Sequence, residues 1–63
     1  MAPHQKRVIY ERQELDEKLQ KLGSFLFGDI FNSLHEDERT RLLKQNAYMT
    51  MYRDILDARI AAF

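Results

Sequence analysis

The chain has 63 residues, with ten Lys and Arg residues balanced by ten Asp and Glu residues, and it has no cysteine. A chain of this length forms one domain, residues 1–63, and buries only about 60% of its unfolded surface, so self-association is the expected stabiliser. The balanced charge argues against a DNA- or RNA-binding protein. Disulfides and thiolate metal sites are excluded, and no apolar run approaches the roughly 20 residues of a membrane span.

Catalysis and metal binding have little support in the sequence. His4 and His35 are the only histidines and are far apart, so we expect no metal and no cofactor. Ser24 and Ser33 have no base partner near them, and no nucleophile, base and orienting residue can be assembled. The protein is therefore not expected to be an enzyme. The N-terminus also lacks the apolar core of a signal peptide, which predicts a cytoplasmic protein.

The first predicted element is a helix over about residues 3–22. Pro3 suits the first helical position, and no residue that breaks helices follows it before Gly23. A continuation through Gly23 to Phe27 stays open. Apolar residues recur at alternating steps of three and four, and a single arginine interrupts this stripe. The stripe consists of Val8, Arg12, Leu15, Leu19, Leu22 and Leu26.

The connection over residues 23–33 is unusually apolar. It contains both glycines and three of the four phenylalanines of the chain. This composition does not suit an exposed linker, so the aromatic rings are expected to plug one end of a helical hairpin. The stretch 29–31 is compatible with a single helical turn.

The second predicted helix runs over about residues 34–62. Ser33 and Glu36 match a capping box, and the acidic stretch 36–38 suits the positive end of the helix dipole. Its stripe again steps by three and four and contains an arginine near the same end of the hairpin. The stripe consists of Leu42, Gln45, Met49, Tyr52, Leu56, Arg59 and Phe63.

The second helix has a further apolar face, which predicts a second neighbour. The predicted fold is an all-α antiparallel hairpin that assembles into a homo-oligomeric helical bundle, because a second copy is the simplest cover for that face. An alternative is that the first helix is wide enough to cover both faces. The predicted oligomer interface consists of Ala47, Met51, Ile55, Ala58 and Ala62.

Polar residues concentrate at the open end of the predicted hairpin. A turn near residues 27–33 sets Arg12 opposite Tyr52 and the Gln5 region opposite Arg59. Guanidinium groups and aromatic rings recognise phosphates and bases, and a guanidinium on a buried stripe needs a partner. The predicted ligand-binding residues are His4, Gln5, Arg7, Tyr10, Arg12, Tyr52 and Arg59. The structural alternative is that Arg12 pairs with Asp16 or Glu11. Arg59 would then extend into solvent at the C-terminal end of the helix, or pair with Asp54 or Asp57 across the oligomer.

Two end motifs carry a resemblance that covers nearly the whole chain. The opening Pro-His-Gln-Lys-Arg of residues 3–7, the stretch 14–22 and the closing Arg-Ile-Ala-Ala-Phe of residues 59–63 resemble very small phage proteins of the crAss-phage type. The resemblance implies a phage accessory protein in the host cytoplasm. In size and design the chain is also similar to the small helical oligomers that sequester nucleotide signals of CBASS and Thoeris immunity.

These observations lead to a first functional hypothesis and two alternatives. In the first, the chain counters host immunity by sequestering a small anionic, nucleotide-derived signal without cleaving it. In the second, it is an inhibitor or adaptor that binds a host protein. The contact would be an exposed helix face, such as the acidic stretch 36–38, or the closed-end residues Phe25, Phe27 and Phe31. In the third, it is a purely structural phage oligomer. No membrane partner is expected in any of them.

Overall fold

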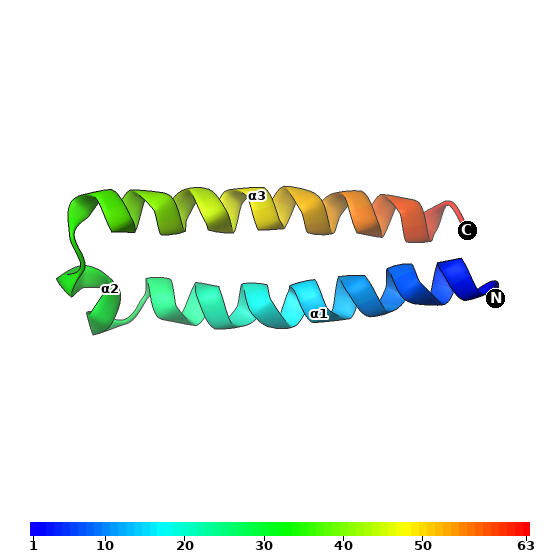
Figure 1. Ribbon diagram of the computed structural model, residues 1–63, viewed down its shortest axis with the longest axis horizontal. Helices are drawn as coiled ribbons and strands as arrows, with labels where there is room; N and C mark the ends of the chain where they lie inside the picture. The colour runs from blue at the N-terminus through cyan, green and yellow to red at the C-terminus, as the bar shows by residue number, and fades with distance from the viewer.

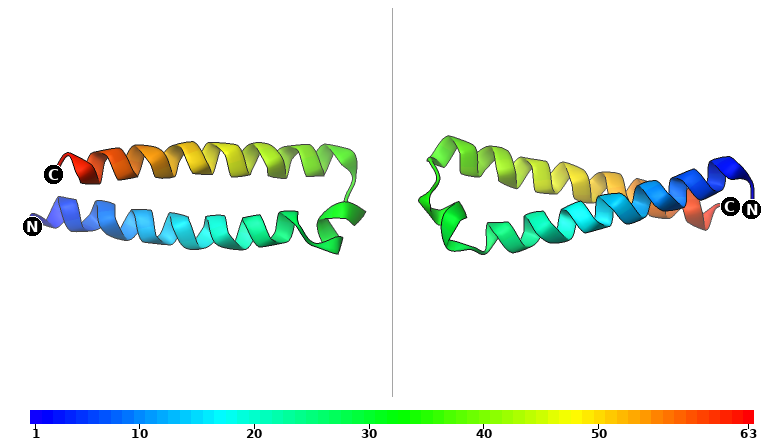
Figure 2. Two further views of the ribbon diagram at one scale, coloured as in Figure 1. Left: turned by 180° about the vertical axis from the view of Figure 1, so that it is seen from behind. Right: turned by 60° about the horizontal axis from the view of Figure 1, so that its bottom comes forward.

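The computed structural model describes all 63 residues as an antiparallel helical hairpin with no β-strand. Helix α1 spans Pro3–Leu26, the short helix α2 spans Asp29–Ser33, and α3 spans Glu36–Ala61 (Figure 1). The two long helices lie side by side with a slight crossing, and both termini lie at the same end (Figure 2). The molecule is a rod of 46 × 15 × 13 Å. The predicted all-α hairpin is confirmed.

Helix α1 begins where the sequence predicts and ends later than the predicted residue 22. Pro3 occupies the first turn, and the helix continues through Gly23 to Leu26. Gly23 has ordinary helical geometry, without a positive φ, and lies in open space. The glycine therefore does not interrupt the backbone hydrogen bonds of the helix, although glycine has a low helix propensity.

The closed end of the hairpin contains the predicted helical turn as α2, but the predicted capping box does not form. Ser33 belongs to α2, where its Oγ donates a hydrogen bond to the carbonyl of Ile30 at 2.6 Å. His35 caps α3 instead, because its Nδ1 accepts a hydrogen bond from the backbone N–H of Asp37 at 3.1 Å. The extended backbone of Leu34 separates the two helices. Helix α3 accordingly starts at residue 36 rather than 34.

The core is a single row of apolar contacts between α1 and α3. Val8, Leu15 and Leu19 of α1 are buried against Leu56 of α3, which has 0% of its surface exposed. Met49 packs against this cluster, as does Ile60. At the closed end, the rings of Phe25 and Phe31 meet edge to face, with centroids 6.4 Å apart. The α1 stripe predicted from the sequence is therefore the face that contacts α3.

Helix α3 is rotated relative to the predicted stripe. Leu42, Met49 and Leu56 do face α1, but the half-buried positions between and beyond them include Asn46, Thr50, Arg53 and Ile60. The predicted stripe residues Gln45, Tyr52, Arg59 and Phe63 are exposed. The register also differs, because Arg12 contacts Asp57 rather than residue 52. The shift is five residues, a little more than one helical turn.

Candidate functional site

Four charged residues on one flank of the α1–α3 contact form a connected ion-pair cluster. Arg12 Nε donates to Asp57 Oδ1 at 2.8 Å, and Arg12 Nη1 lies 3.6 Å from Asp16 Oδ1. Arg53 Nη1 lies 3.4 Å from the same Asp16 oxygen. Two guanidinium groups and two carboxylates therefore neutralise each other across the hairpin. The contact with Asp16 matches the structural alternative for Arg12, whereas the shorter contact is with Asp57, which the sequence had suggested as a partner of Arg59.

The ion-pair cluster changes the acidity of its two best-connected members. The hydrogen bond between them lowers the pKa of Asp57 and raises the pKa of Arg12, while desolvation opposes both shifts. The positive charge of Arg53 lowers the pKa of Asp57 further. A lowered carboxylate pKa stabilises the folded state above the ordinary aspartate pKa, and that contribution is lost as the pH falls through the lowered value.

Replacing Asp57 with asparagine is expected to destabilise the hairpin at neutral pH and to have a diminishing effect in acid. Both chains lack the Asp57 charge once the pH falls below the lowered pKa of the wild-type carboxylate, so the difference between them should vanish there. The measurement is urea unfolding, followed by circular dichroism, at several pH values. Asp54→Asn is the matched control, because Asp54 has no cation within 4.0 Å. Equal, pH-independent losses in both variants would contradict a role for the ion pair.

The structure disperses the seven predicted ligand-binding residues. Gln5 is engaged within its own helix, because its Oε1 accepts a hydrogen bond from the backbone N–H of Ala2 at 2.9 Å. Arg12 is held by its two carboxylate partners. The remaining five are exposed: His4, Arg7, Tyr10, Tyr52 and Arg59. No pocket forms among them in a single hairpin.

The ion pairs fix which residues of the two helices lie level along the rod. Because Arg12 lies opposite Asp57, and Asp16 opposite Arg53, Tyr10 is level with Arg59. Arg7 is level with residue 62, whereas Tyr52 is level with residue 17. With a rise of about 1.5 Å per residue, Arg7 and Tyr52 are separated by about 15 Å along the axis. Arg7, Tyr10 and Arg59 therefore belong to the open end, and Tyr52 lies nearer the middle of the rod.

Three of the six arginines have no carboxylate within 4.0 Å. Arg12, Arg41 and Arg53 are paired, whereas Arg7, Arg39 and Arg59 are not. Arg7 and Arg59 are exposed. A guanidinium without an internal partner keeps all its donors for an external phosphate or carboxylate.

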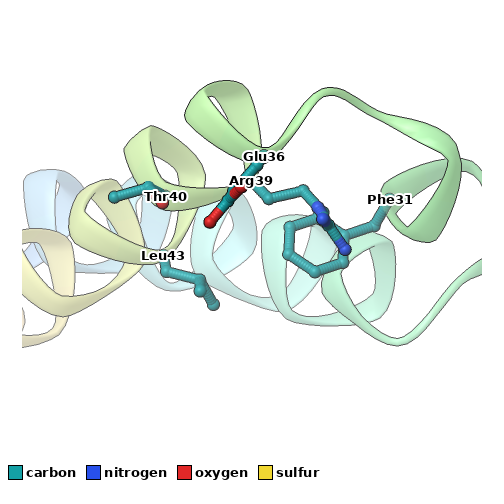
Figure 3. A pocket seen from close by; sticks show the side chains of 5 residues that line it. All are labelled: Phe31, Glu36, Arg39, Thr40 and Leu43. Atoms are coloured by element: carbon teal, nitrogen blue, oxygen red, sulfur yellow. The ribbon is translucent and has the colours of Figure 1, made fainter.

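The structure contains a hollow at the closed end of the hairpin, whereas the sequence predicted a ligand site at the open end. It has a volume of about 220 Å³ and is lined by Phe31, Glu36, Arg39, Thr40 and Leu43. The Arg39 side chain extends toward the Phe31 ring (Figure 3), and its buried Nε has no hydrogen-bond partner. A typical small-molecule site measures roughly 300–1,000 Å³, so the hollow has room for only a fragment of such a ligand.

Sequence reasoning did not single out Arg39, Arg53 or Asp57 as functional candidates. A signal for two of them exists, because Arg53 and Asp57 are four residues apart and match the spacing of Arg12 and Asp16 on the facing helix. When two antiparallel helices each carry an arginine and an aspartate four residues apart, one alignment of the helices sets each arginine opposite an aspartate. The spacing therefore indicates the register of the hairpin. No such sequence pattern identifies Arg39. Its lack of a carboxylate partner depends on how the closed end folds.

Comparisons with models of known protein families identify a relationship. The model of the Sequestin family matches residues 2–62 of the chain. No curated protein and no solved structure matches.

None of the helices combines the length and the apolar character that crossing a membrane requires. The structure also brings no three histidine, aspartate or glutamate side chains together as a group that could hold a metal ion.

Proposed function

The chain belongs to the Sequestin family, and we propose that it binds and sequesters a small nucleotide-derived signal without cleaving it. The family name points to sequestration but identifies no ligand. On the resemblance to small phage proteins, we further propose a phage accessory protein that acts in the host cytoplasm against an immune signal.

The observation that carries the ligand class is the exposed pair of unpaired arginines at the open end, Arg7 and Arg59, together with the exposed Tyr10 and Tyr52. Guanidinium groups bind phosphate through paired N–H donors, and tyrosine rings stack on bases at little conformational cost. The net charge of zero favours a small ligand over a nucleic acid, since a polymer binder gains affinity from many uncompensated cations.

The ligand contacts are assigned to the predicted residues that remain free in the hairpin. Arg7 and Arg59 would hold phosphate, Tyr10 and Tyr52 would stack, and His4 would donate a hydrogen bond to a base or ribose. Gln5 and Arg12 are excluded from this set because each is already bonded within the hairpin. The axial separation of these residues means that one hairpin does not gather all of them around one small ligand.

A thermal-shift titration tests this function. The panel contains cyclic di- and trinucleotides, cyclic ADP-ribose isomers and linear nucleotides. A ligand that binds only the folded state stabilises it by about 2.7 kcal/mol at 100 times its Kd, a large shift for a chain of this size. Arg59→Gln should remove the shift produced by the active compound. The matched control is Arg41→Gln, because Arg41 is exposed but paired with Glu38 at 2.9 Å.

Two outcomes would contradict this function. The active compound should be recovered intact after incubation with the protein, and a cleaved product would contradict sequestration. A flat panel with a folded protein would overturn the nucleotide assignment. It would favour the second candidate, a host-protein inhibitor, for which the closed end offers Phe27 at 93% exposure and the exposed Ile30. Capture of one stoichiometric host partner that Phe27→Ala abolishes would establish that alternative.

A further inference from the structure

Helix α3 presents an apolar row on the side that faces away from α1. The row steps by three and four residues, which is the spacing of a packed helix contact. Its three large members are mostly exposed: Tyr48 at 67%, Met51 at 60% and Ile55 at 59%. Ala58 and Ala62 complete it and are also exposed. Because α1 lies along only one side of α3 (Figure 1), this row stays largely open to solvent in the single hairpin.

The exposed surface of the hairpin matches what a second copy would cover. A compact monomer of 7.6 kDa exposes about 4,300 Å². The hairpin exposes 4,940 Å², an excess of about 650 Å² over that scaling. Stable protein interfaces bury roughly 600–1,000 Å² per partner. The excess therefore corresponds to one interface, and only four of the 63 residues are buried without it.

The order of side-chain sizes along the row indicates the orientation of the second copy. Large residues occupy the first half, Tyr48 and Met51, and alanines occupy the second half. When two copies run antiparallel about a two-fold axis at Ile55, Tyr48 lies level with Ala62, and Met51 lies level with residue 59, one residue beyond Ala58. Large side chains then pack against small ones along the whole contact. A parallel arrangement would place Tyr48 against Tyr48 and leave alanine against alanine.

We propose that a second copy docks antiparallel on this row, and that the pair forms an anion-binding groove along one edge of the contact. Tyr52 lies three residues before Ile55, and Arg59 lies four after it. At 100° per residue, both project on the same side of the row. The axis at Ile55 sets Tyr52 of one copy level with residue 58 of the other, and therefore beside Arg59 of that copy.

The resulting groove has two guanidinium groups and two phenol rings, related by the two-fold axis. The two Arg59 residues are about 12 Å apart along the helix direction, from eight residues at about 1.5 Å each. The other α3 residues on this edge, Gln45 and Phe63, carry no carboxylate. The groove suits a small ligand with two phosphates and a base near each. This part of the inference rests on the proposed function.

Cysteine cross-linking tests the antiparallel pair cleanly, because the chain has no cysteine of its own. Met51→Cys and Ala58→Cys are made as separate chains, mixed and oxidised, and the products are distinguished by mass. We expect a disulfide that joins one Met51→Cys chain to one Ala58→Cys chain. Ile55→Cys, which lies on the axis, should cross-link to itself. Gln13→Cys, at an exposed α1 position, is the control and should not cross-link efficiently.

Other outcomes overturn the pair. Met51→Cys chains that cross-link mainly to themselves would show a parallel contact. Sedimentation of the unmodified chain as a monomer at all concentrations, with no Ile55→Cys disulfide, would remove the interface altogether.

The groove is tested separately with cyclic di-AMP and cyclic di-GMP on the cross-linked pair. Binding that falls at least tenfold in Arg59→Gln, while the cross-linked pair still forms, supports the groove. Unchanged affinity in Arg59→Gln would overturn the groove and leave the interface standing. If the wild-type chain binds no compound of the wider panel, the proposed function fails and the cross-linking result is unaffected.

Discussion

Replacing Leu56 with alanine is expected to cost about 2–5 kcal/mol of folding free energy, the range for removing a fully buried leucine side chain. Leu56 has 0% exposure and is the one α3 member of the buried apolar cluster that Val8, Leu15 and Leu19 of α1 complete. A protein of 63 residues typically has roughly 3–9 kcal/mol of stability in total. The substitution should therefore remove a large part of the stability of the fold, seen as a much lower midpoint of unfolding.

Urea unfolding followed by circular dichroism measures this effect. Leu43→Ala is the matched control, since it makes the same chemical change on the same helix at a position that is 52% exposed. Surface substitutions of this kind usually change stability by less than about 0.5 kcal/mol. Similar losses for the two variants would show that the α1–α3 contact is not the main source of stability.

Replacing Ile55 with glutamate is expected to abolish self-association. Ile55 lies at the centre of the exposed α3 row. On the proposed two-fold axis, one substitution buries two carboxylates next to each other without a cation. Desolvation and like-charge repulsion then act together against the pair. We expect at least a 100-fold weaker association, and a melting temperature that no longer rises with protein concentration.

Analytical ultracentrifugation and melting curves over a wide concentration range provide the readout. Ile30→Glu is the matched control, because Ile30 is also an exposed isoleucine, 66% against 59%, but lies on α2 away from the row. This variant should associate like the wild type. An Ile55→Glu chain that still forms the wild-type assembly would place the contact elsewhere.

The sequence predicted the hairpin and the packing face of α1 because both follow from local patterns. Helix α1 has one apolar stripe, so its periodicity admits one orientation, and Val8, Leu15 and Leu19 are buried as expected. Helix α3 has several apolar stripes. The predicted and observed faces share Leu42, Met49 and Leu56 and differ only in the residues between and beyond them. Periodicity does not distinguish two rotations that agree at these positions, and the interhelical ion pairs decide between them.

The candidate site was harder to predict because it depends on tertiary register. Arg12 was correctly placed on the α1 stripe, but its partner Asp57 lies 45 residues away in the sequence. Likewise, the capping role of His35 depends on α2 taking up Ser33, which a local S-x-x-E match does not reveal. A five-residue register shift then moves Tyr52 away from the open end. Local signals therefore identify the residue types of the site but not their arrangement.

The two-sided character of α3 bears on how freely each helix can change in sequence. One side of α3 packs on α1, and the opposite side carries the row that we assign to a second copy, so few α3 positions are free of a packing role. Helix α1 packs on one side only, and its far side carries solvated residues such as Gln13, Glu17 and Lys21. In a family built on this plan, substitutions should accumulate on the back of α1. If family members vary in sequence on the far side of α1 but little on either side of α3, that pattern alone would indicate that α3 is an interface between copies.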